Sequence, residues 1–508
     1  MLRSKKTSHG RPLDLDAACG LGLFLASAAI YLAFLSKTYV FEGLARAMPI
    51  ELNHFRDLFN GNYVLYGFVG WCFHSALSIF VDLTAVTSLQ ILDALLGAAG
   101  VSLFFRIHRK IGFDRASALL GAGVLGSTLG YWRWSTDAED YIFSTLLLLL
   151  NFHMLIDYGE KRRSRPAVLG FAYALAVGGH IVNAAFAPVA LWFVIRANPR
   201  QWKRPAAEYA ASGLVAALAM YGVALAIVHP SNPSDALRWF WGSAASPAGV
   251  TFGGGQSPWK IWLWLRTSVH ALTSISPAFP APWSGPFGFF ASSVLFPALL
   301  WFARLFALIL LGRIAFRGRT LPEQDRTIAG GCFLWIGAYA LIFTSWQPDT
   351  LVYRTTDLPP LCLLLCLSAR RLPIPTRSAL AVLMSCLFFG NLGAEILPRS
   401  DASNNPGLAR MDFVRAHTNE GDWVTGGGGR DELYLPFFAQ RKPLVVDRFR
   451  ADPDQILEFA RRISKRNESI YVTSTIMRDP FWSGFFRRVK LAPLAADSSG
   501  FALYRLKL

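Results

Sequence analysis

The chain has 508 residues, of which 53% are hydrophobic and only 16% are charged. A soluble domain carries about 25% charged residues, and a single soluble core stops growing at roughly 250–300 residues. The composition therefore excludes one soluble globular domain, a disordered chain, a secreted disulfide scaffold and a collagen-like fibre. Apolar stretches of membrane-spanning length recur between Leu21 and Glu395, separated by short loops rich in arginine. We interpret the chain as a polytopic α-helical membrane protein.

The net charge of +17 results from 50 Lys+Arg against 33 Asp+Glu, and such a surplus can indicate nucleic-acid binding. The positions of the charges argue against that function. Clusters of Lys and Arg beside spanning helices mark the cytoplasmic side of a membrane, and they attract anionic lipid headgroups. We therefore predict membrane lipids and no nucleic acid as partners. Most basic residues before Arg399 lie in six short segments: 1–16, 106–115, 161–165, 196–204, 313–326 and 370–377.

The six cysteines lie in or beside apolar stretches, and their spacing does not resemble that of metal ligands. Thiols in such positions usually behave as small buried hydrophobic side chains. Arg304, inside an apolar stretch, is expected to extend toward the cytoplasmic headgroups.

The apolar stretches are predicted to be helices, and a span needs about 20 apolar residues. All six basic segments fall on one side only if two stretches are not single crossings. Residues 62–82 must lie at the interface or re-enter the membrane, and residues 166–196 must form a hairpin of two short helices that breaks at Gly178-Gly179-His180. This gives about eleven transmembrane helices, with the N-terminus cytoplasmic and the first stretch retained as an anchor rather than cleaved. In chain order the stretches are 17–36, 62–82, 86–105, 115–132, 140–157, 166–196, 206–228, 288–312, 327–345, 356–369 and 378–395.

From Arg399 onward the composition changes to that of a soluble α/β unit. We predict a transmembrane catalytic domain at 1–398 and a small extracytoplasmic α/β domain at 399–508. Residues 452–466 (DPDQILEFARRISKR) have the pattern of an amphipathic helix with an acidic start and a basic end. The order of strands and helix favours a small, mostly parallel sheet. Gly426–Gly429 is better interpreted as a flexible loop than as a phosphate-binding loop. It has neither the GxGxxG spacing nor the Lys-Ser/Thr pair of a P-loop. The predicted strands are DWVTGGGG, PLVVDRF, SIYVTS and FALYRLKL.

This topology gathers acidic and aromatic residues on the external face of the membrane. Glu42 directly follows the first span, and an exposed interfacial carboxylate is the alternative to a functional one. Asp137, Glu139 and Asp140 crowd one short loop, where they would raise one another's pKa values, bind a cation or cap the following helix. Asp93 lies inside a predicted span, so it needs a partner or must be neutral.

His180 lies at the break of the predicted hairpin, with Asn183 one turn further on. A histidine in a membrane protein is often a hydrogen-bonded packing residue, and a ligand-binding role is the alternative. The few external basic residues are candidates to bind an anionic headgroup, and Arg133 could instead pack against the neighbouring Trp132 and Trp134. These basic candidates are Arg56, Arg133, Lys260, Arg266 and Arg354.

Three classes of function remain open at this point. An enzyme acting on a charged lipid needs an apolar groove, cations at headgroup depth and a carboxylate that deprotonates an acceptor, and all three are predicted on the external face. A transporter or flippase for a lipid-linked anion would place its ionisable groups at mid-membrane in repeated halves, and we find no internal repeat. The third class is a non-catalytic scaffold for envelope assembly.

Four segments within residues 15–395 resemble the integral membrane glycosyltransferases of the C-type fold, which include protein O-mannosyltransferases and lipid A aminoarabinose transferases. The first is an acid and a small amphipathic segment after the first span, and the second is a tyrosine-rich re-entrant stretch. The third is an acid–x–Tyr element, and the fourth is a glycine-rich hairpin leading to a proline. In this chain they are FEGLAR at 41–46, NGNYVLYG at 60–67, Glu139-Asp140-Tyr141 and GGHIVNAAFAP at 178–188.

The resemblance implies transfer of a sugar, with inversion, from a polyprenyl-phosphate donor to a hydroxyl of a glycan, lipid or protein acceptor. Glu42 would be the general base. Glu139 or Asp137 would orient the acceptor or hold a divalent cation, which is the one candidate cofactor, and His180 would lie near the phosphate or the sugar. A bacterial inner membrane is the expected location. The predicted catalytic residues are Glu42 and Glu139, and the predicted substrate-binding residues are Arg56, Asp57, Tyr66, Arg133, Asp137, Asp140, Tyr141, His180, Asn183, Lys260 and Arg354.

Overall fold

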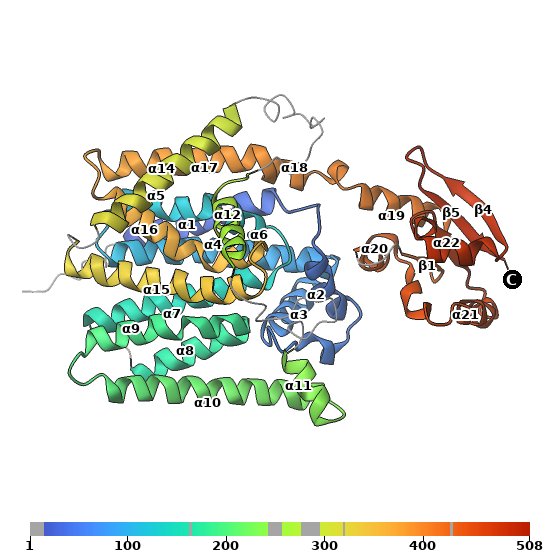
Figure 1. Ribbon diagram of the computed structural model, residues 1–508, viewed down its shortest axis with the longest axis horizontal. Coiled ribbons are helices and arrows are strands. Elements are labelled where there is room, and N and C mark those ends of the chain that lie inside the picture. Colours follow the sequence, from blue (N-terminus) through green and yellow to red (C-terminus); the bar gives the residue numbers. More distant parts are fainter. Residues whose placement is uncertain are drawn as a thin grey trace, which may run out of the picture.

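The computed structural model describes residues 15–161, 165–241, 257–275, 295–317, 321–426 and 430–507. An elongated helical bundle occupies most of it, and a smaller α/β unit lies at one end of the bundle (Figure 1). Seven described helices are long and apolar enough to cross a membrane. They are α1 (Leu15–Ala33), α4 (Ala85–Lys110), α7 (Asp140–Lys161), α10 (Lys203–Val228), α14 (Leu295–Arg317), α15 (Glu323–Ser345) and α17 (Thr376–Asn391), which continues to Ser400.

Shorter helices complete the bundle. The apolar ones are α8 (Pro166–Gly179), α9 (Ala187–Ala197) and α16 (Leu358–Ala369), and α5 (Arg115–Ser127) packs against α4 and α17. The polytopic membrane architecture is thus confirmed, while the count of eleven crossings stays a prediction. The other helices before residue 400 are α2 (Phe41–Glu51), α3 (Tyr66–Leu77), α6 (Leu129–Ser135), α11 (Pro233–Trp241), α12 (Pro258–Leu272) and α18 (Leu397–Ser400), with η1 (Phe55–Leu58), η2 (Ile181–Phe186), η5 (Val352–Thr356) and the π-helical η6 (Leu392–Ile396).

Both stretches that were not expected to be single crossings have the predicted form. Residues 62–82 yield only α3, whose 12 residues are too few for a span, and α2 and α3 lie at the end of the bundle (Figure 1). In 166–196, α8 ends at Gly179, and His180 is extended with φ −160° before η2 and α9 begin. The hairpin therefore breaks at Gly178-Gly179-His180, as predicted.

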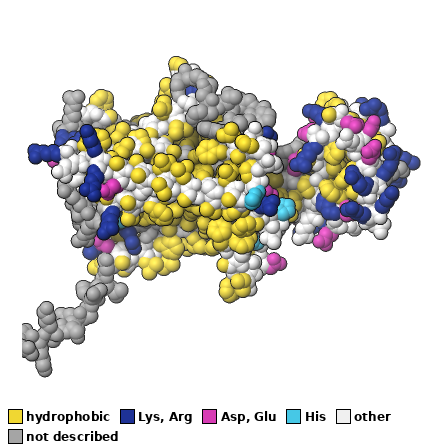
Figure 2. All heavy atoms as spheres, turned by 90° about the horizontal axis from the view of Figure 1, so that it is seen from below, with side chains coloured by type: hydrophobic (Ala, Val, Ile, Leu, Met, Phe, Trp, Pro, Cys, Tyr) yellow, Lys and Arg dark blue, Asp and Glu magenta, His cyan; other side chains and the backbone are white. Residues whose placement is uncertain are grey.

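Ion pairs join the helix ends at the opposite end of the bundle, which we call the basic end. Asp16 pairs with Arg109 at 3.0 Å and with Arg115 at 2.6 Å, and Asp325 pairs with two arginines of the loop after α16. Figure 2 shows Lys and Arg side chains gathered there, beyond a broad hydrophobic belt. Basic segments that were predicted to lie on one side of the membrane thus meet at one end of the bundle. Residues 1–14, 162–164 and 318–320 lie outside the described part.

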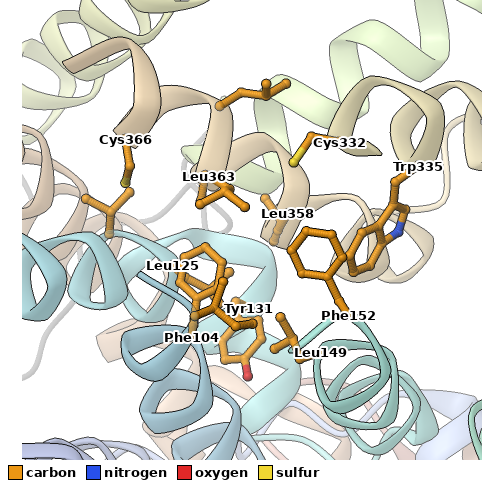
Figure 3. Close-up of a cluster of buried hydrophobic side chains, with 14 of the residues drawn as sticks. Phe104, Leu125, Tyr131, Leu149, Phe152, Cys332, Trp335, Leu358, Leu363 and Cys366 are labelled. Carbon is orange, nitrogen blue, oxygen red and sulfur yellow. The ribbon is translucent and has the colours of Figure 1, made fainter. Parts of the chain in front are cut away.

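The interior of the bundle is built from interlocking aromatic and aliphatic side chains (Figure 3). Cys332, Cys362, Cys366 and Cys386 are buried there, as predicted, whereas Cys19 is half-buried and Cys72 on α3 is exposed. All six thiols are unpaired. Cysteine is a small apolar side chain in this setting, and its burial fills space between helices.

The expectation for Arg304 was wrong. Its guanidinium donates to Thr273 Oγ1 at 2.7 Å and to the Ser274 carbonyl, directly after α12. Protein acceptors close to the helix replace the lipid headgroups, because a partly buried guanidinium needs hydrogen-bond partners within reach.

The C-terminal unit is a five-stranded sheet in the order β2-β1-β3-β5-β4. Strands β2, β1 and β3 are parallel, and β3-β5 and β5-β4 are antiparallel. The sheet is therefore mixed, and the prediction of a mostly parallel sheet was wrong, because β5 pairs antiparallel with both β3 and β4. The strand β4 was not recognised in the sequence, and PLVVDRF contributes only a short strand before a 3-10 turn. Residues 427–429 of the glycine run lie outside the described residues. The elements are η7 (Ala402–Asn404), α19 (Pro406–His417), β1 (Trp423–Thr425), α20 (Arg430–Tyr434), η8 (Leu435–Ala439), β2 (Lys442–Leu444), η9 (Val446–Phe449), α21 (Gln455–Ser464), β3 (Ile470–Thr473), η10 (Ile476–Arg478), α22 (Pro480–Arg487), β4 (Leu491–Ala496) and β5 (Ala502–Leu506).

The C-terminal unit packs on the segment that contains α2. The Tyr39 ring lies 4.7 Å from the Phe438 ring and 6.2 Å from the Tyr434 ring, centroid to centroid. The Lys37 amide donates to the Arg399 carbonyl at 2.7 Å. One buried apolar cluster accordingly contains side chains of α2, α3, α19 and η8. The predicted domain boundary at residue 398 stays a prediction, and the last helix of the bundle runs past it to Ser400.

Candidate active site

A cavity of about 700 Å³ opens at the end of the bundle that carries the C-terminal unit. Four segments that are distant in sequence form its walls: the start of α2 with the loop before α3, the loop between α6 and α7, the hairpin break at His180, and the loop between α15 and α16. Five predicted site residues line it: Glu42, Arg133, Glu139, Tyr141 and His180. The other polar or aromatic lining residues were not predicted as site residues. They are Phe41, Arg46, Asn60, Asn62, Tyr63, Trp134, Trp346, Gln347, Thr350 and Tyr353.

One wall of the cavity is acidic and is organised around Arg46. The first turn of α2 places Glu42 at the exposed mouth, and Arg46 follows one helical turn later on the same face. Arg46 Nη1 lies 2.8 Å from Glu139 Oε2, and Nη2 contacts Asp140 Oδ1. Its guanidinium also lies over the Tyr63 ring, 4.7 Å from the centroid. A single buried cation thus holds the acidic loop against α2.

Glu139 is a carboxyl group suited to holding a proton. Its burial raises its pKa well above the usual value, and the charges of Asp140, Glu42 and Asp137 raise it further, while Arg46 opposes the rise. Arg46 itself loses solvation on burial, but Asp140 and Glu139 outweigh that effect and raise its pKa. Carboxyl groups whose environments differ this strongly are the usual source of acid and base pairs in enzymes.

Asp93 lies beneath this wall and fixes it. Its Oδ2 accepts hydrogen bonds from the Tyr66 hydroxyl and from the Glu139 amide, each at 2.7 Å. Asp93 and Tyr66 are fully buried, so Tyr66 supports the cavity from below and does not line it. The expectation that Asp93 needs a partner is thereby met.

His180 faces the acidic wall from the hairpin break. Its Nδ1 accepts a hydrogen bond from the Val182 amide at 3.1 Å, so its proton resides on Nε2, which lies 3.7 Å from Asp140 Oδ2. The imidazole packs 4.5 Å from the Tyr141 ring. Burial lowers the pKa of His180 to about 4, although Asp140 opposes the change. The ring is therefore a neutral hydrogen-bond donor at pH 7 and not a fixed positive charge.

Arg133 also lines the cavity, and its guanidinium lies 4.5 Å from the Trp134 ring centroid. Aromatic side chains also line the cavity: Tyr353 lies 5.4 Å from the Tyr141 ring and stacks on Trp346 at 5.5 Å. Tyr353 also stacks on Phe343 at 5.0 Å, and its hydroxyl donates to Gln347 Oε1 at 3.0 Å. Flat aromatic faces with a few convergent polar groups are typical of sites for organic ligands.

Several predicted residues lie outside the cavity walls. Asp137 and Asp140 are buried behind the acidic wall. Arg56 and Asp57 are exposed on η1, where Asp57 lies 3.6 Å from His54. Lys260 is half-buried in the first turn of α12. Their assignments as substrate-binding residues stay predictions.

Two further predicted residues are engaged in internal contacts. Asn183 donates to the Ala176 carbonyl and accepts from the Tyr339 hydroxyl, both at 2.8 Å. Arg354 is fully buried, pairs with Asp357 at 3.0 Å and packs on the Phe343 ring. These contacts stabilise the hairpin and the loop that carries Tyr353, and they place both residues one layer behind the cavity.

The described acids do not fit a resident metal ion. No group of three or more His, Cys, Asp or Glu side chains in the described ranges is arranged to hold one. Arg46 occupies the position between Glu139 and Asp140 where a cation would bind. A side-chain cation, Arg46, therefore pairs with both of these acids.

No family model matches the chain, and no curated protein matches its sequence. Solved structures do match it. The crystal structure of ArnT from Cupriavidus metallidurans bound to undecaprenyl phosphate has a TM-score of 0.65 and 12% identity, and the match covers 96% of this chain and 97% of that one. The apo structure of the same protein gives 0.64 and 13%, covering 96% and 98%. The chain therefore has the C-type membrane fold of ArnT over nearly its whole length, as the sequence resemblance implied.

Proposed function

We propose that this protein is a membrane glycosyltransferase that moves a sugar from a polyprenyl-phosphate donor to an acceptor hydroxyl. The observation that carries the proposal is the cavity itself, which is lined by the carboxyl groups of Glu42 and Glu139 together with the guanidinium of Arg133. Its fold is that of ArnT, a protein whose crystal structure holds undecaprenyl phosphate. The ArnT structure supports a polyprenyl phosphate as the carrier of the sugar. The residues that line the cavity support transfer of that sugar to a hydroxyl.

Glu42 is proposed to activate the acceptor. Its carboxylate lies at the exposed mouth of the cavity, where an incoming hydroxyl can donate its proton. The hydroxyl oxygen then attacks the anomeric carbon from the face opposite the lipid phosphate. The bond from that carbon to the phosphate oxygen breaks, the phosphate leaves with the electron pair, and the proton ends on Glu42. Inversion follows from this single displacement. Glu139 and His180 orient the acceptor and the sugar by hydrogen bonds.

Arg133 is proposed to bind the lipid phosphate. A guanidinium matches the geometry of phosphate oxygens and remains charged at all relevant pH values. Charge develops on the phosphate as it leaves, and a cation in a partly dry site stabilises that charge better than water does. The acids repel the phosphate and Arg133 attracts it, so the phosphate is proposed to bind nearest Arg133 and the acceptor nearest Glu42.

The orientation in the membrane is part of the proposal. We place the cavity and the unit after residue 398 outside the cytoplasm of a bacterial inner membrane, with residues 1–398 as the transmembrane domain. The clustering of Arg and Lys at the basic end supports this orientation, because cytoplasmic loops carry the excess of positive charge.

The test is a deletion strain examined by mass spectrometry of its polyprenyl-phosphate lipids and envelope glycans. A missing sugar together with accumulated lipid-linked donor is the expected result, and an unchanged profile would overturn the proposal. Complementation with Glu42→Gln should fail, with activity lower by about 10²–10⁴-fold. Asp82→Asn is the matched control and should complement fully. Asp82 is also an exposed acid, and it lies in the loop between α3 and α4.

A further inference from the structure

Glu395 is a carboxylate with no assigned role in the last long helix of the bundle. It is only 2% exposed, and it lies in the one π-helical turn of that helix, Leu392–Ile396. Acidic groups in membrane helices are costly and are kept where they have partners and a role. A π turn inside an α-helix is a rare geometry that occurs often at functional sites. Both observations single out this residue.

Three basic side chains from distant parts of the chain converge on Glu395. Its Oε1 accepts from Arg133 Nη1 at 3.1 Å and from Arg399 Nε at 3.0 Å. Its Oε2 lies 3.7 Å from His270 Nε2, at the end of α12. The cluster therefore joins α6, α12 and the end of the last helix around one buried carboxylate.

The two arginines of this cluster differ in what else they contact. Arg399 Nη1 donates to Thr38 Oγ1 at 3.0 Å, and the Arg399 carbonyl accepts from the Lys37 amide, so Arg399 connects the last helix to the segment before α2. Arg133 instead lines the cavity. Its Nε has no hydrogen-bond partner among the described residues. Arg133 is thus the member of the cluster that can receive a ligand.

Charge explains why Arg133 needs this support. Asp137 and Glu139 also attract Arg133, and they belong to the acidic side of the cavity. Glu395 pairs directly with the guanidinium of Arg133 and neutralises one of the two arginine charges of the cluster, which leaves one positive charge beside the cavity. Removing one partner of a buried ion pair leaves an uncompensated charge, which is strongly unfavourable. Without Glu395, Arg133 would therefore turn toward the acids.

We infer that Glu395 is a positioning residue that holds Arg133 against the attraction of Asp137 and Glu139, so that the guanidinium stays at the cavity and receives the phosphate of the lipid. The inference rests on the proposed function, because it assumes a lipid-phosphate ligand. It adds that the phosphate subsite is completed from behind by a residue 262 positions further along the chain.

The test is binding of undecaprenyl phosphate to the purified full-length protein in detergent, for wild type, Arg133→Ala, Glu395→Gln and the double variant. We expect each single variant to weaken binding by about tenfold or more. The double variant should bind no more weakly than Arg133→Ala alone, since Glu395 acts through Arg133. Glu395→Asp keeps the charge and should recover much of the lost affinity.

Asp325→Asn is the matched control, because Asp325 is also a buried carboxylate held by two arginines, but at the basic end. It should lower the unfolding temperature and leave binding unchanged. Additive losses from Arg133→Ala and Glu395→Gln would overturn the positioning role, as would full affinity in Glu395→Gln. A wild-type protein that does not bind undecaprenyl phosphate would contradict the proposed function itself, which keeps the two failures distinct.

Discussion

The Tyr66 hydroxyl and the Asp93 carboxylate are joined by a buried hydrogen bond of 2.7 Å that links the start of α3 to the middle of α4. The same Asp93 oxygen accepts from the Glu139 amide, so one carboxylate fixes both the non-spanning helix and the acidic loop. The floor of the cavity is therefore a polar contact between the long apolar helix α4 and two segments at the end of the bundle, α3 and the loop before α7.

Tyr66→Phe should lower both activity and stability. It removes one donor to a buried carboxylate, which costs about 1–3 kcal/mol, and it frees α3 to shift relative to Glu139. The matched control is Tyr31→Phe, which removes another buried tyrosine hydroxyl, one that donates to the Gly126 carbonyl at 3.0 Å. Thermal unfolding in detergent should show similar losses for both, whereas transfer activity should fall only in Tyr66→Phe. Equal activities would count against the contact as a support of the site.

Arg46→Gln should be strongly destabilising, by about 3–5 kcal/mol, because it leaves Glu139 and Asp140 buried without their cation. The double variant Arg46→Gln/Glu139→Gln should regain part of that stability, since it also replaces one of the two acids that lose their partner. Unfolding temperatures of the three proteins measure this. Chelators should leave the wild-type unfolding temperature unchanged, because Arg46 already occupies the position between the two acids.

The stability of the protein should vary with pH through His180. Its pKa is about 4 in the folded chain against an ordinary value of 6.5, so the unfolded chain binds a proton first as the pH falls. The contribution is fully present above pH 6.5 and is lost toward pH 4, by up to about 3 kcal/mol. His180→Asn can still accept from the Val182 amide and should remove this dependence.

Asp357 acts in the opposite direction and must be separated from His180. Burial raises its pKa from 3.8 to about 7, against the opposing charge of Arg354, so its contribution is lost as the pH rises through that range. The informative quantity is therefore the difference in unfolding temperature between wild type and His180→Asn at each pH. A difference that stays constant from pH 4 to 7 would refute the buried neutral histidine.

Phe438→Ala should lower activity although Phe438 does not line the cavity. Its ring packs on Tyr39, two residues before the helix that carries Glu42 and Arg46, so its loss removes support from the acidic wall. Undecaprenyl phosphate binding should be retained, because Arg133 is held separately. Phe481→Ala, a partly exposed aromatic of α22, is the control within the same unit and should leave transfer unchanged. Loss of lipid binding in Phe438→Ala would contradict this division.

The sequence predicted the structure correctly where the hydrophobic pattern, or the requirement that basic segments lie on one side of the membrane, determines it. The lengths of the apolar stretches predicted the helices. The requirement that all basic segments lie on one side of the membrane predicted both the non-spanning stretch 62–82 and the break at His180. Arg46 and Glu395 were missed as site residues for a common reason. Their roles depend on partners 93 and 262 positions away, and helix periodicity carries no information on which distant charge a side chain meets. The strand β4 was missed because its pattern is neither clearly alternating nor continuously apolar.

The exposed thiol of Cys72 has a practical consequence. It lies on α3, beside the floor of the cavity, while the remaining cysteines are buried or half-buried. A maleimide that does not cross membranes should therefore label this position first, and labelling of intact cells would report directly which compartment the cavity faces. The Cys72 thiol can also carry a fluorophore or a spin label, so no engineered cysteine is needed. Movements of α3 during turnover can then be followed by spectroscopy.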